Sequence, residues 1–494
     1  MHSEGSDNAW LDYLVSEHII DGPMESRRRA AVLNLLRSLI APLMRWVAKD
    51  RDLKHEFQCQ LMPFGSVGLG AHLANADMDL VFLAPSPVRR RDFFNIFPTL
   101  LRKQPTIHDI DVIQRTTVPI IKCTVDSIDI DISFVRLKLN TVPPSIDLLD
   151  DNLMRDLDEI CLASMDGPRC HRFIQQRIDL RHSAVFRHAL QCIKFWAQNR
   201  LIYGKPMGYL NGSSWTILLL KTYLVSSTNS EDLTIYGLLR SFFGMWATWP
   251  WPTPVVVTDS IPRLYGGSLI YNILPEFEEA VMPIVTPCAP VSSAAPKVTK
   301  STLRVLTNEF ERAESILKAR FEKPSLMMKK LFKPLYYVRR YKHFIVIITC
   351  CDTIKSHETW IRKMAANIPK LVSHLETVPC LQQVHPITDN YSGVRYYHTR
   401  QEKINFQKGF AFTSQNSTDF SIPLEPGSMH ITYYLIGLDV TASSDGDSVI
   451  DVSKETKAFL DELGAKRNQK DVDVHIELTA LKRKQVADMI KGLK

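Results

Sequence analysis

Four aspartates in the first third of the sequence stand where carboxylates could hold metal ions. Asp77 and Asp79 begin an apolar run that ends at Leu83, and side chains two apart on a strand share one face. Two bare carboxylates about 7 Å apart repel each other, and a divalent cation relieves that repulsion. Further on, Asp129 and Asp131 alternate with isoleucines, and this alternation does not choose between them as a third ligand. These residues predict a site for divalent metal ions.

A glycine-rich segment precedes the first carboxylate pair. Gly65 and Ser66 predict a tight turn whose backbone N–H groups and hydroxyl could bind an anion. Such a turn beside carboxylates for two metal ions roughly 4 Å apart is what phosphoryl transfer requires. The chain has no G-x-x-x-x-G-K-[ST] P-loop, and its glycines lead into acidic residues and a strand, unlike those of a dinucleotide fingerprint. The combination therefore predicts phosphoryl transfer outside those two motif classes.

The elements that must position these residues follow from hydrophobic periodicity. An amphipathic helix is predicted at 26–49, and a sheet at 60–140 is predicted from β-rich runs at 78–84, 120–125 and 128–134. Helices dominate 150–245, proline-rich ordered loops fill 247–300, and another helix covers 301–320. The remaining expectations are a strand from 341, a helix at 358–377, strands at 407–414 and 429–438, a polar loop at 443–448 and a strand from 472.

Composition narrows the class of protein. The chain has 494 residues with 45% apolar and 23% charged residues, which excludes disordered and fibrous classes and allows about three domains. Nine cysteines without a C-x-x-C pair disfavour zinc and disulfides and predict a reducing compartment. No apolar run approaches the roughly 18 residues of a membrane span, and the polar N-terminus does not look like a secretory signal. We expect an intracellular multidomain protein without a membrane segment.

The Gly65-Ser66 turn, Asp77-x-Asp79 and the later acidic strand resemble the nucleotidyltransferase superfamily of the DNA polymerase beta type. Further stretches, in family order along the chain, resemble eukaryotic poly(A) polymerases. They are Val118-Pro-Ile-Ile-Lys, Ile193-Lys-Phe-Trp-Ala-Gln with Ile202-Tyr and Gly208-Tyr-Leu-Asn-Gly-Ser-Ser-Trp, Trp249-Pro-Trp-Pro-Thr-Pro with Met282-Pro-Ile-Val-Thr-Pro, and Tyr341-Lys-His-Phe-Ile-Val with Lys482-Arg-Lys-Gln.

The resemblance implies roles for particular residues. It places the catalytic, metal-binding triad on Asp77, Asp79 and Asp131, with Mg²⁺ or Mn²⁺ as the cofactor and ATP as the substrate. It places the nucleotide contacts on Phe64, Gly65, Ser66, Lys194, Tyr203, Gly212 and Ser213.

Three positions near the base depart from the family pattern or match it weakly. The family's Gly-Gly-Val is Asn211-Gly212-Ser213 in this chain, and its Asn-Gly turn corresponds to Asp166-Gly167, so base selection is less well defined than catalysis. Thr302 matches a threonine near the base.

The implied fold is α+β and multidomain. It comprises a nucleotidyltransferase palm with a mixed sheet and helices at 1–175, a helical central domain at 176–325, and an RNA-recognition-motif-like (RRM-like) α+β domain at 326–494. The start of the last domain interleaves aromatic and cationic residues suited to stacking bases and neutralising phosphates. These residues are Phe332, Tyr336, Tyr337, Arg339, Arg340, Tyr341, Lys342 and His343. A packed domain junction is the alternative interpretation, and no standard RNP1 signature is present.

The sequence thus favours a template-independent polynucleotide adenylyltransferase that adds AMP from ATP to RNA 3′ ends, as in mRNA polyadenylation. The alternatives are a terminal uridylyltransferase and a non-catalytic RNA-binding subunit of the same fold. The expected partners are an oligo(A) RNA 3′ end, ATP, and mRNA cleavage and polyadenylation factors. We expect a monomer in the nucleus, and no regulation through a long Ser/Thr-rich basic tail.

Overall fold

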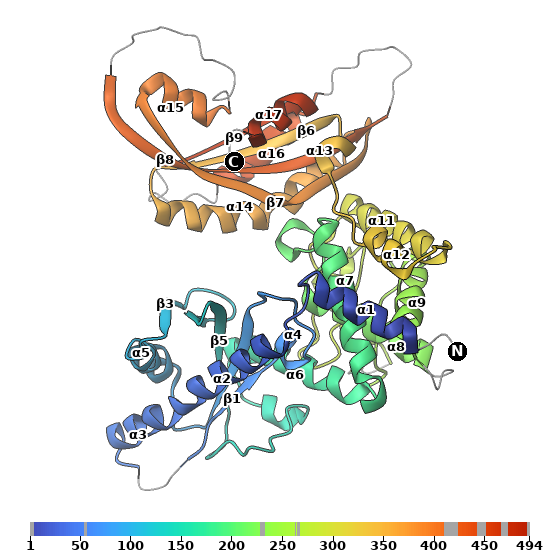
Figure 1. Ribbon diagram of the computed structural model, residues 1–494. Coiled ribbons are helices and arrows are strands. Elements are labelled where there is room, and N and C mark those ends of the chain that lie inside the picture. The colour runs from blue at the N-terminus through green and yellow to red at the C-terminus, as the bar shows by residue number, and fades with distance from the viewer. Residues whose placement is uncertain are drawn as a thin grey trace.

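The computed structural model describes residues 4–53, 57–227, 233–261, 263, 267–409, 423–441, 451–465 and 473–491. Figure 1 shows two sheet-containing parts, the palm below and the C-terminal part above, joined by a helical central part at one side. This arrangement agrees with the predicted α+β multidomain class. The exact boundaries at 175/176 and 325/326 stay predictions.

A five-stranded mixed sheet forms the palm, with the strand order β1-β2-β5-β4-β3. Strand β2 runs parallel to β5, and the other neighbouring pairs are antiparallel. The strands are β1 (Gln60–Pro63), β2 (Met78–Ala84), β3 (Ile107–Ile113), β4 (Ile120–Val125) and β5 (Ile128–Arg136). The runs predicted at 78–84, 120–125 and 128–134 match β2, β4 and most of β5, because each alternates apolar residues or is bounded by turn residues.

Alternation along β2 and β5 separates the two faces of the palm sheet. Even-numbered residues such as Leu80 and Ile132 pack in the core under α2 (Pro23–Ser38), α3 (Ile40–Asp50) and α5 (Arg90–Leu101). Odd-numbered residues such as Val81 and Val135 pack on the opposite face with Cys161 of α6 (Glu159–Arg177). The carboxylates of Asp79 and Asp131 therefore share the face covered by α6.

The predicted helix at 26–49 is the pair α2 and α3, which meet at Leu39. By length and composition alone, this 28-residue stretch, Pro23–Asp50, is long and apolar enough to cross a membrane. A helix that packs one side on a protein core meets the same criterion, and Leu36, Leu43 and Val47 lie in the palm core. The absence of a membrane segment stays a prediction.

The central part is a bundle of helices around an aromatic core. Trp196 lies 4.8 Å from Phe243 and 5.7 Å from Trp215 between ring centroids, and Phe310 stacks on the same indole. The N-terminal helix α1 packs against α9 and α12 of this bundle. Its main helices are α1 (Glu4–Ser16), α7 (Ser183–Asn199), α8 (Gly212–Ser226), α9 (Ile235–Ala247), α11 (Lys300–Lys318) and α12 (Pro324–Leu331). Only short helical turns, η5 (Ile270–Ile273) and α10 (Pro275–Glu278), interrupt the described loops of the proline-rich stretch.

The C-terminal part is an antiparallel four-stranded sheet with the order β7-β8-β6-β9. Its strands are β6 (His343–Cys351), β7 (Leu381–Thr399), β8 (Pro423–Val440) and β9 (Val474–Lys482). Helices α14 (Ile354–Leu375) and α16 (Ser453–Gly464) pack against one face. The other face lies against α13 (Tyr337–Arg340), α15 (Arg400–Gln407) and α17 (Arg483–Lys491). In Figure 1, α14 lies below the sheet, toward the palm.

One strand of this part was not predicted, and one predicted strand lies mostly outside the described residues. Strand β7 was not predicted, because Pro386, Gly393 and its exposed polar residues interrupt the apolar alternation, as an edge strand tolerates. The strand predicted at 407–414 starts on the last residue of helix α15, and from residue 410 it lies outside the described residues, as does the polar loop at 443–448.

The aromatic and cationic cluster ahead of β6 is mainly a packed junction, which corrects the base-stacking interpretation for its buried members. Phe332, Tyr337 and Tyr341 are buried, because they fill the cores of the central and C-terminal parts. Tyr341 packs so closely that a Cβ on Gly437 would lie 2.3 Å from its ring. Tyr336 is 62% exposed and remains available to a partner.

Candidate active site

The structure forms the predicted glycine turn as one short helical turn, α4 (Gly65–Gly68), which contacts the first carboxylate strand directly. The backbone N–H of Phe64 donates to the carbonyl of Asp79 at 3.0 Å, which ties the end of β1 to the start of β2. Gly65 has φ +61°, and a Cβ there would lie 3.1 Å from Oδ2 of Asp79. Glycine is favoured at this position both because the conformation is left-handed and because the carboxylate approaches so closely.

Two of the three predicted metal ligands lie side by side on the sheet. Asp79 and Asp131 are directly paired in the parallel β2–β5 ladder, and Asp77 lies two residues ahead of Asp79. The carboxylate of Asp131 accepts from Lys122 Nζ at 2.9 Å, whereas Asp129 accepts from the hydroxyl of Thr124 at 2.8 Å. The ladder thus brings Asp131, rather than Asp129, level with Asp79.

The carboxylates of Asp77, Asp79 and Asp131 place several negative charges close together at this end of the sheet. Burial and, after it, the neighbouring charges of Asp131 and Asp77 together raise the pKa of Asp79 to about 6. Burial also raises the pKa of Asp77, with the charges of Asp131 and Asp129 as the next causes. Carboxylates that are this hard to ionise together are stabilised by positive charge.

The donor set fits a hard divalent cation, although the side chains do not converge on one. In the part of the chain that the structure describes, no three His, Cys, Asp or Glu side chains are arranged to hold a metal ion. The ammonium of Lys122 pairs with Asp131 instead. Oxygen-only ligands on adjacent strands, with excess negative charge, are the donors that Mg²⁺ and Mn²⁺ prefer. Asp77, Asp79 and Asp131 are therefore the residues that would hold the ions.

A cavity of about 340 Å³ opens beside Asp79, between the palm and the central part. This volume is in the range of small-molecule sites. It brings together all seven residues predicted to contact the nucleotide, which come from the glycine turn, α7, the loop after α7 and the start of α8. They are Phe64, Gly65, Ser66, Lys194, Tyr203, Gly212 and Ser213.

Lys194 places a buried cation at this cavity. Its side chain comes from α7, the residue is 4% exposed, and Nζ donates to the carbonyl of Ala71 at 3.1 Å. Burial lowers its pKa to about 8. The ammonium of Lys194 has three N–H donors, and the Ala71 carbonyl accepts from one of them. A phosphate oxygen could accept from another.

Gly212 lets helix α8 approach Tyr203 and Lys194, two of the other predicted nucleotide residues. A Cβ at Gly212 would lie 3.0 Å from the hydroxyl of Tyr203 and 3.9 Å from Cε of Lys194. Burial raises the pKa of Tyr203 to about 12, so its hydroxyl stays a neutral donor. Asn211 caps α8 and accepts from the hydroxyl of Ser213 at 2.8 Å.

Sequence reasoning missed several residues of the cavity, mainly on α6. Asp166 and Gly167, which the family resemblance places near the base, line it. The missed residues Cys170, His171 and Ile174 follow Gly167 at the three- and four-residue spacing of one helix face. Burial lowers the pKa of His171 to about 4, so this ring is neutral. That spacing was the available signal, and it would have extended the site from Asp166-Gly167 along the helix.

Thr302 does not line the cavity. It is fully buried in the first turn of α11, where its hydroxyl accepts from the backbone N–H of Thr299 at 2.8 Å. The structure therefore does not place Thr302 at the cavity, where the predicted contact with the base would be made.

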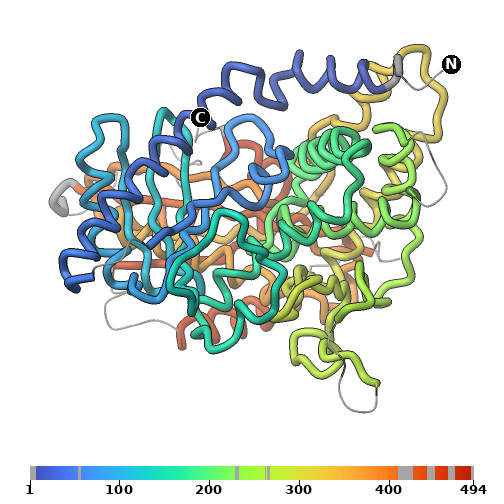
Figure 2. Tube along the Cα trace, turned by 90° about the horizontal axis from the view of Figure 1, so that it is seen from below, coloured from blue at the N-terminus to red at the C-terminus, as the bar shows by residue number. Residues whose placement is uncertain are grey.

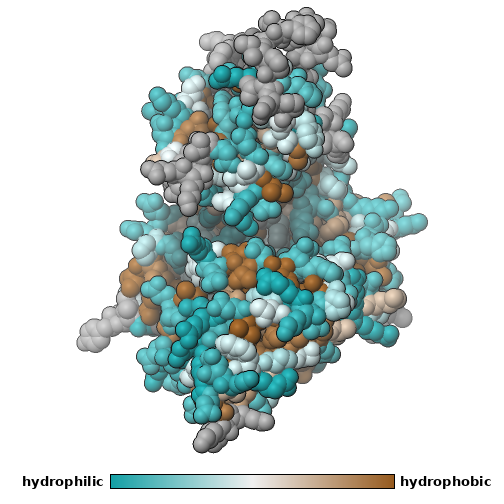
Figure 3. Space-filling view, turned by 90° about the vertical axis from the view of Figure 1, so that its left-hand side faces the viewer, coloured by the Kyte–Doolittle hydropathy of each residue, from teal (hydrophilic) through white to brown (hydrophobic). Residues whose placement is uncertain are grey.

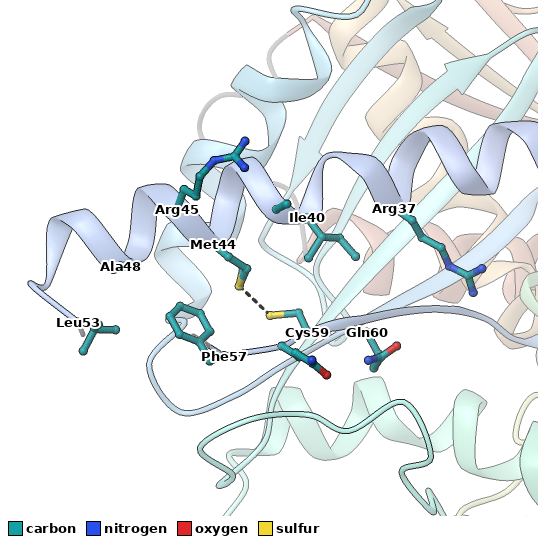
Figure 4. Close-up of a pocket in the computed structure, with 11 residues that line it drawn as sticks. Arg37, Ile40, Met44, Arg45, Ala48, Leu53, Phe57, Cys59 and Gln60 are labelled. Carbon is teal, nitrogen blue, oxygen red and sulfur yellow. Dashed lines mark hydrogen bonds between the residues drawn. The ribbon is translucent and has the colours of Figure 1, made fainter. Parts of the chain in front are cut away.

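A larger cavity, of about 560 Å³, lies outside the predicted site (Figure 4). It is formed between α2, α3 and the segment 57–60 that leads into β1. In the close-up, the Cys59 thiol contacts the Met44 sulfur at 3.0 Å, while Arg37 and Arg45 extend outward. None of the predicted catalytic or nucleotide residues lines it, so size alone does not mark the active site.

A mixed sheet with a glycine turn, paired carboxylates and a nucleotide-sized cavity that holds a buried lysine defines the class of nucleotidyltransferases. Three family models match successive parts of the chain. They are the poly(A) polymerase nucleotidyltransferase domain at residues 6–178, the poly(A) polymerase central domain at 185–334, and the poly(A) polymerase predicted RNA binding domain at 336–493. The chain belongs to the eukaryotic poly(A) polymerase family.

Curated relatives agree with these matches over most of the chain. Poly(A) polymerase PAPalpha of Candida albicans is 28% identical over 92% of this chain and 83% of its own length. Poly(A) polymerase pla1 of Schizosaccharomyces pombe is 28% identical over 83% of this chain and 72% of its own length. Among solved structures, the Cid1 poly(U) polymerase is similar at 19% identity and a TM-score of 0.45, over 68% of this chain and 100% of that one.

Proposed function

We propose that this protein is a template-independent polynucleotide adenylyltransferase, which adds AMP from ATP to RNA 3′ ends in mRNA polyadenylation. One observation carries the proposal: a single cavity joins the carboxylate of Asp79, the glycine turn and the buried ammonium of Lys194. Family membership over nearly the whole chain supports the adenylyl specificity.

In the reaction, the primer's 3′-hydroxyl loses its proton to solvent and its oxygen bonds to the α-phosphorus of ATP, while the bond from that phosphorus to the pyrophosphate oxygen breaks and pyrophosphate leaves. Mg²⁺ or Mn²⁺ supplies charge neutralisation and lowers the pKa of the 3′-hydroxyl. Asp77, Asp79 and Asp131 would hold these ions. The glycine turn and the ammonium of Lys194 bind the phosphate oxygens and balance the charge that develops on pyrophosphate.

We propose that the RNA primer lies between the palm and helix α14 of the C-terminal part. Figure 3 shows a hollow between these two parts on the face opposite the central helices. Helix α14 carries the exposed cations Lys355 and Arg362, and cations on such a surface neutralise backbone phosphates. Because helices cover both faces of the C-terminal sheet, RNA contact falls to helix surfaces rather than to strands.

A primer-extension assay tests the activity. The protein is incubated with an oligo(A) RNA primer, Mg²⁺ and each of the four nucleoside triphosphates in turn. We expect long extension with ATP and little with UTP, CTP or GTP. A UTP preference would identify a terminal uridylyltransferase. Tight RNA binding without extension by any nucleotide would identify a non-catalytic RNA-binding subunit.

We also propose that the protein acts in the nucleus, as a monomer, together with mRNA cleavage and polyadenylation factors. Family membership supports this setting. The short basic cluster Lys482-Arg483-Lys484 adds little support as a nuclear import signal, because it is part of the junction between β9 and α17. Fluorescence microscopy of the tagged full chain, light scattering of the purified protein and co-purification from nuclear extract test these three statements. Cytoplasmic signal, a dimer mass or the absence of such factors would contradict them in turn.

A further inference from the structure

Arg29 is the buried member of an arginine run whose other members are exposed. Arg27 and Arg28 face solvent on α2, whereas Arg29 is 7% exposed. In Figure 2 this N-terminal segment, in dark blue, runs from the central part across to the palm. A buried guanidinium needs partners for its donors, and these partners show what the residue does.

The partners of Arg29 connect the N-terminal segment to the active site. Its Nε donates to Oδ2 of Asp21 at 2.6 Å, and its terminal nitrogen donates to the carbonyl of Ala76 at 2.8 Å. The same carboxylate oxygen of Asp21, 7% exposed, lies 3.2 Å from Nε2 of His72. Ala76 directly precedes Asp77 in the chain, so one guanidinium holds the peptide group that carries the first predicted metal ligand.

The rest of the loop between the glycine turn and Asp77 is held just as closely. The N–H of Ala74 donates to the carbonyl of Ile19 at 2.8 Å. From α7, Gln191 donates to the carbonyl of His72 at 2.9 Å, and Lys194 to that of Ala71. The loop is thus clamped on one side by the N-terminal segment and on the other by the helix that carries the nucleotide lysine.

Asp77 differs from the other two carboxylates in how it is supported. Asp79 and Asp131 lie within paired strands, so the sheet itself fixes their backbones. Asp77 lies one residue before β2 and is more exposed than Asp79 and Asp131, although it is partly shielded from water. Its backbone position therefore depends on the clamp, whose contact nearest to Asp77 is the one from Arg29.

We propose that Arg29, paired with Asp21, is a positioning residue that holds the Ala76–Asp77 peptide so that the Asp77 carboxylate meets the same cation as Asp79. This inference rests on the proposed function for its role in catalysis, but not for its effect on metal binding. Residues that orient metal ligands in this way typically change metal affinity by 10- to 100-fold when they are replaced.

Direct Mn²⁺ binding, measured from the electron paramagnetic resonance signal of the free ion, tests the proposal on the full chain. Arg29→Met should weaken Mn²⁺ binding about tenfold, and Arg29→Lys, which keeps the charge but not the fork of donors, should lie between it and the wild type. The matched control Arg28→Met, an exposed neighbour on the same helix, should bind within about twofold of wild type.

Folding is kept separate from positioning by a second variant. Arg29→Met leaves Asp21 buried without its cation, so the double substitution Arg29→Met with Asp21→Asn removes that charge as well. We expect the double variant to melt close to the wild type and still to bind Mn²⁺ about tenfold more weakly. A purely structural role would lower the melting temperature and leave the affinity of the folded fraction unchanged.

The outcomes separate this inference from the proposed function. Wild-type affinity in a folded Arg29→Met or double variant overturns the inference, as does a wild-type protein that binds no Mn²⁺. If the wild type binds Mn²⁺ but extends no primer, the proposed activity is wrong, while the binding series still decides the role of Arg29. In an active protein, the variants should also need about tenfold more Mg²⁺ for half-maximal extension, with the primer KM unchanged.

Discussion

The palm sheet and the C-terminal sheet differ in how their faces are covered. The palm sheet has an apolar face buried under three helices. On its other face Asp79 reaches a cavity, and burial, as the largest cause, raises the pKa of Asp79 to about 6. The C-terminal sheet is covered by helices on both faces, and its central strand β6 is buried along nearly its whole length. The proposed chemistry therefore falls on the sheet in which a carboxylate reaches a cavity.

Aromatic residues also have different roles in the two regions, core packing in the C-terminal part and cavity lining in the palm. In the C-terminal part, Tyr337, Tyr341 and Phe344 pack on each other within the core. At the palm, Phe64 lines the nucleotide cavity, and a Cβ on Gly167 would meet its ring at 2.7 Å. An aromatic side chain contributes to ligand binding only where the fold leaves one of its sides open.

The largest expected effect comes from removing a carboxylate of the palm sheet. Asp79→Asn should lower kcat for extension by about 10³-fold or more, because several kcal/mol of charge stabilisation at the reacting phosphate is lost. Primer extension at saturating ATP measures it. The control Asp439→Asn, on strand β8 of the other sheet, removes only an exposed ion pair with Arg340 and should stay within about twofold. Equal losses in both variants would contradict the division of roles.

Truncating a core tyrosine of the C-terminal part should lower stability and leave catalysis nearly unchanged. Tyr341→Ala should lower the free energy of unfolding by about 3 to 4 kcal/mol, since a buried aromatic ring is lost. The kcat per folded molecule should change little. The control Tyr336→Ala removes a ring that is 62% exposed and should change stability by less than about 0.5 kcal/mol. Urea denaturation followed by extension assays separates the two effects.

Lys194 should matter for nucleotide affinity rather than for folding. Lys194→Met should raise the KM for ATP about 10- to 100-fold, because a charge-assisted hydrogen bond to phosphate contributes about 1.5 to 3 kcal/mol. Steady-state kinetics with ATP as the varied substrate measure it. Its stability should not fall, since a buried ammonium with a depressed pKa is removed. An unchanged KM would show that the nucleotide phosphates lie elsewhere.

The same lysine predicts a pH dependence. Its pKa is lowered to about 8, so above that pH the ammonium loses its proton in the free protein, and ATP affinity should fall by up to about tenfold per pH unit. The unfolded chain keeps that proton until its usual range, so this group makes stability rise with pH over the same window. Calorimetric ATP titrations from pH 7 to 9 check the affinity. Lys194→Arg, which stays charged, should abolish the decline.

A smaller effect is expected where the backbone approaches the nucleotide residues. Gly212→Ala places a methyl group 3.0 Å from the Tyr203 hydroxyl and should raise the KM for ATP about tenfold by displacing that side chain. Gly464→Ala, at the end of α16, is the matched control, because among the described residues no atom outside its own helix lies within 4 Å of the new methyl group. Steady-state kinetics on both variants would show a steric effect only in the first.

Much of the palm was predictable because its signals are local. The alternation in β2 and β5 and the short spacing from the glycine turn to Asp77 lie within single elements. The strand β7 was missed because an edge strand can carry proline and exposed polar residues. The roles of Lys194 and Tyr203 came from family resemblance, since a lysine and a tyrosine nine residues apart carry no signal of their own.

The clamp around Asp77 could not have been found in the sequence. Arg29 and Ala76 are 47 positions apart, and the bond is to a backbone carbonyl, which no residue type marks. Arg27, Arg28 and Arg29 are identical in type, and only packing distinguishes the buried one. Pairwise contacts between distant elements are thus the part of a site that the periodicity of one chain does not reveal.

One pair of variants tests the central claim most directly. Asp131 is level with Asp79 in the β2–β5 ladder, while Asp129, two residues earlier on the same face, is bonded to Thr124. Extension of an oligo(A) primer with ATP and Mg²⁺ should be lost in Asp131→Ala and kept within a few-fold of wild type in Asp129→Ala. Undiminished extension by Asp131→Ala, or equal loss in both variants, would contradict the assigned catalytic site.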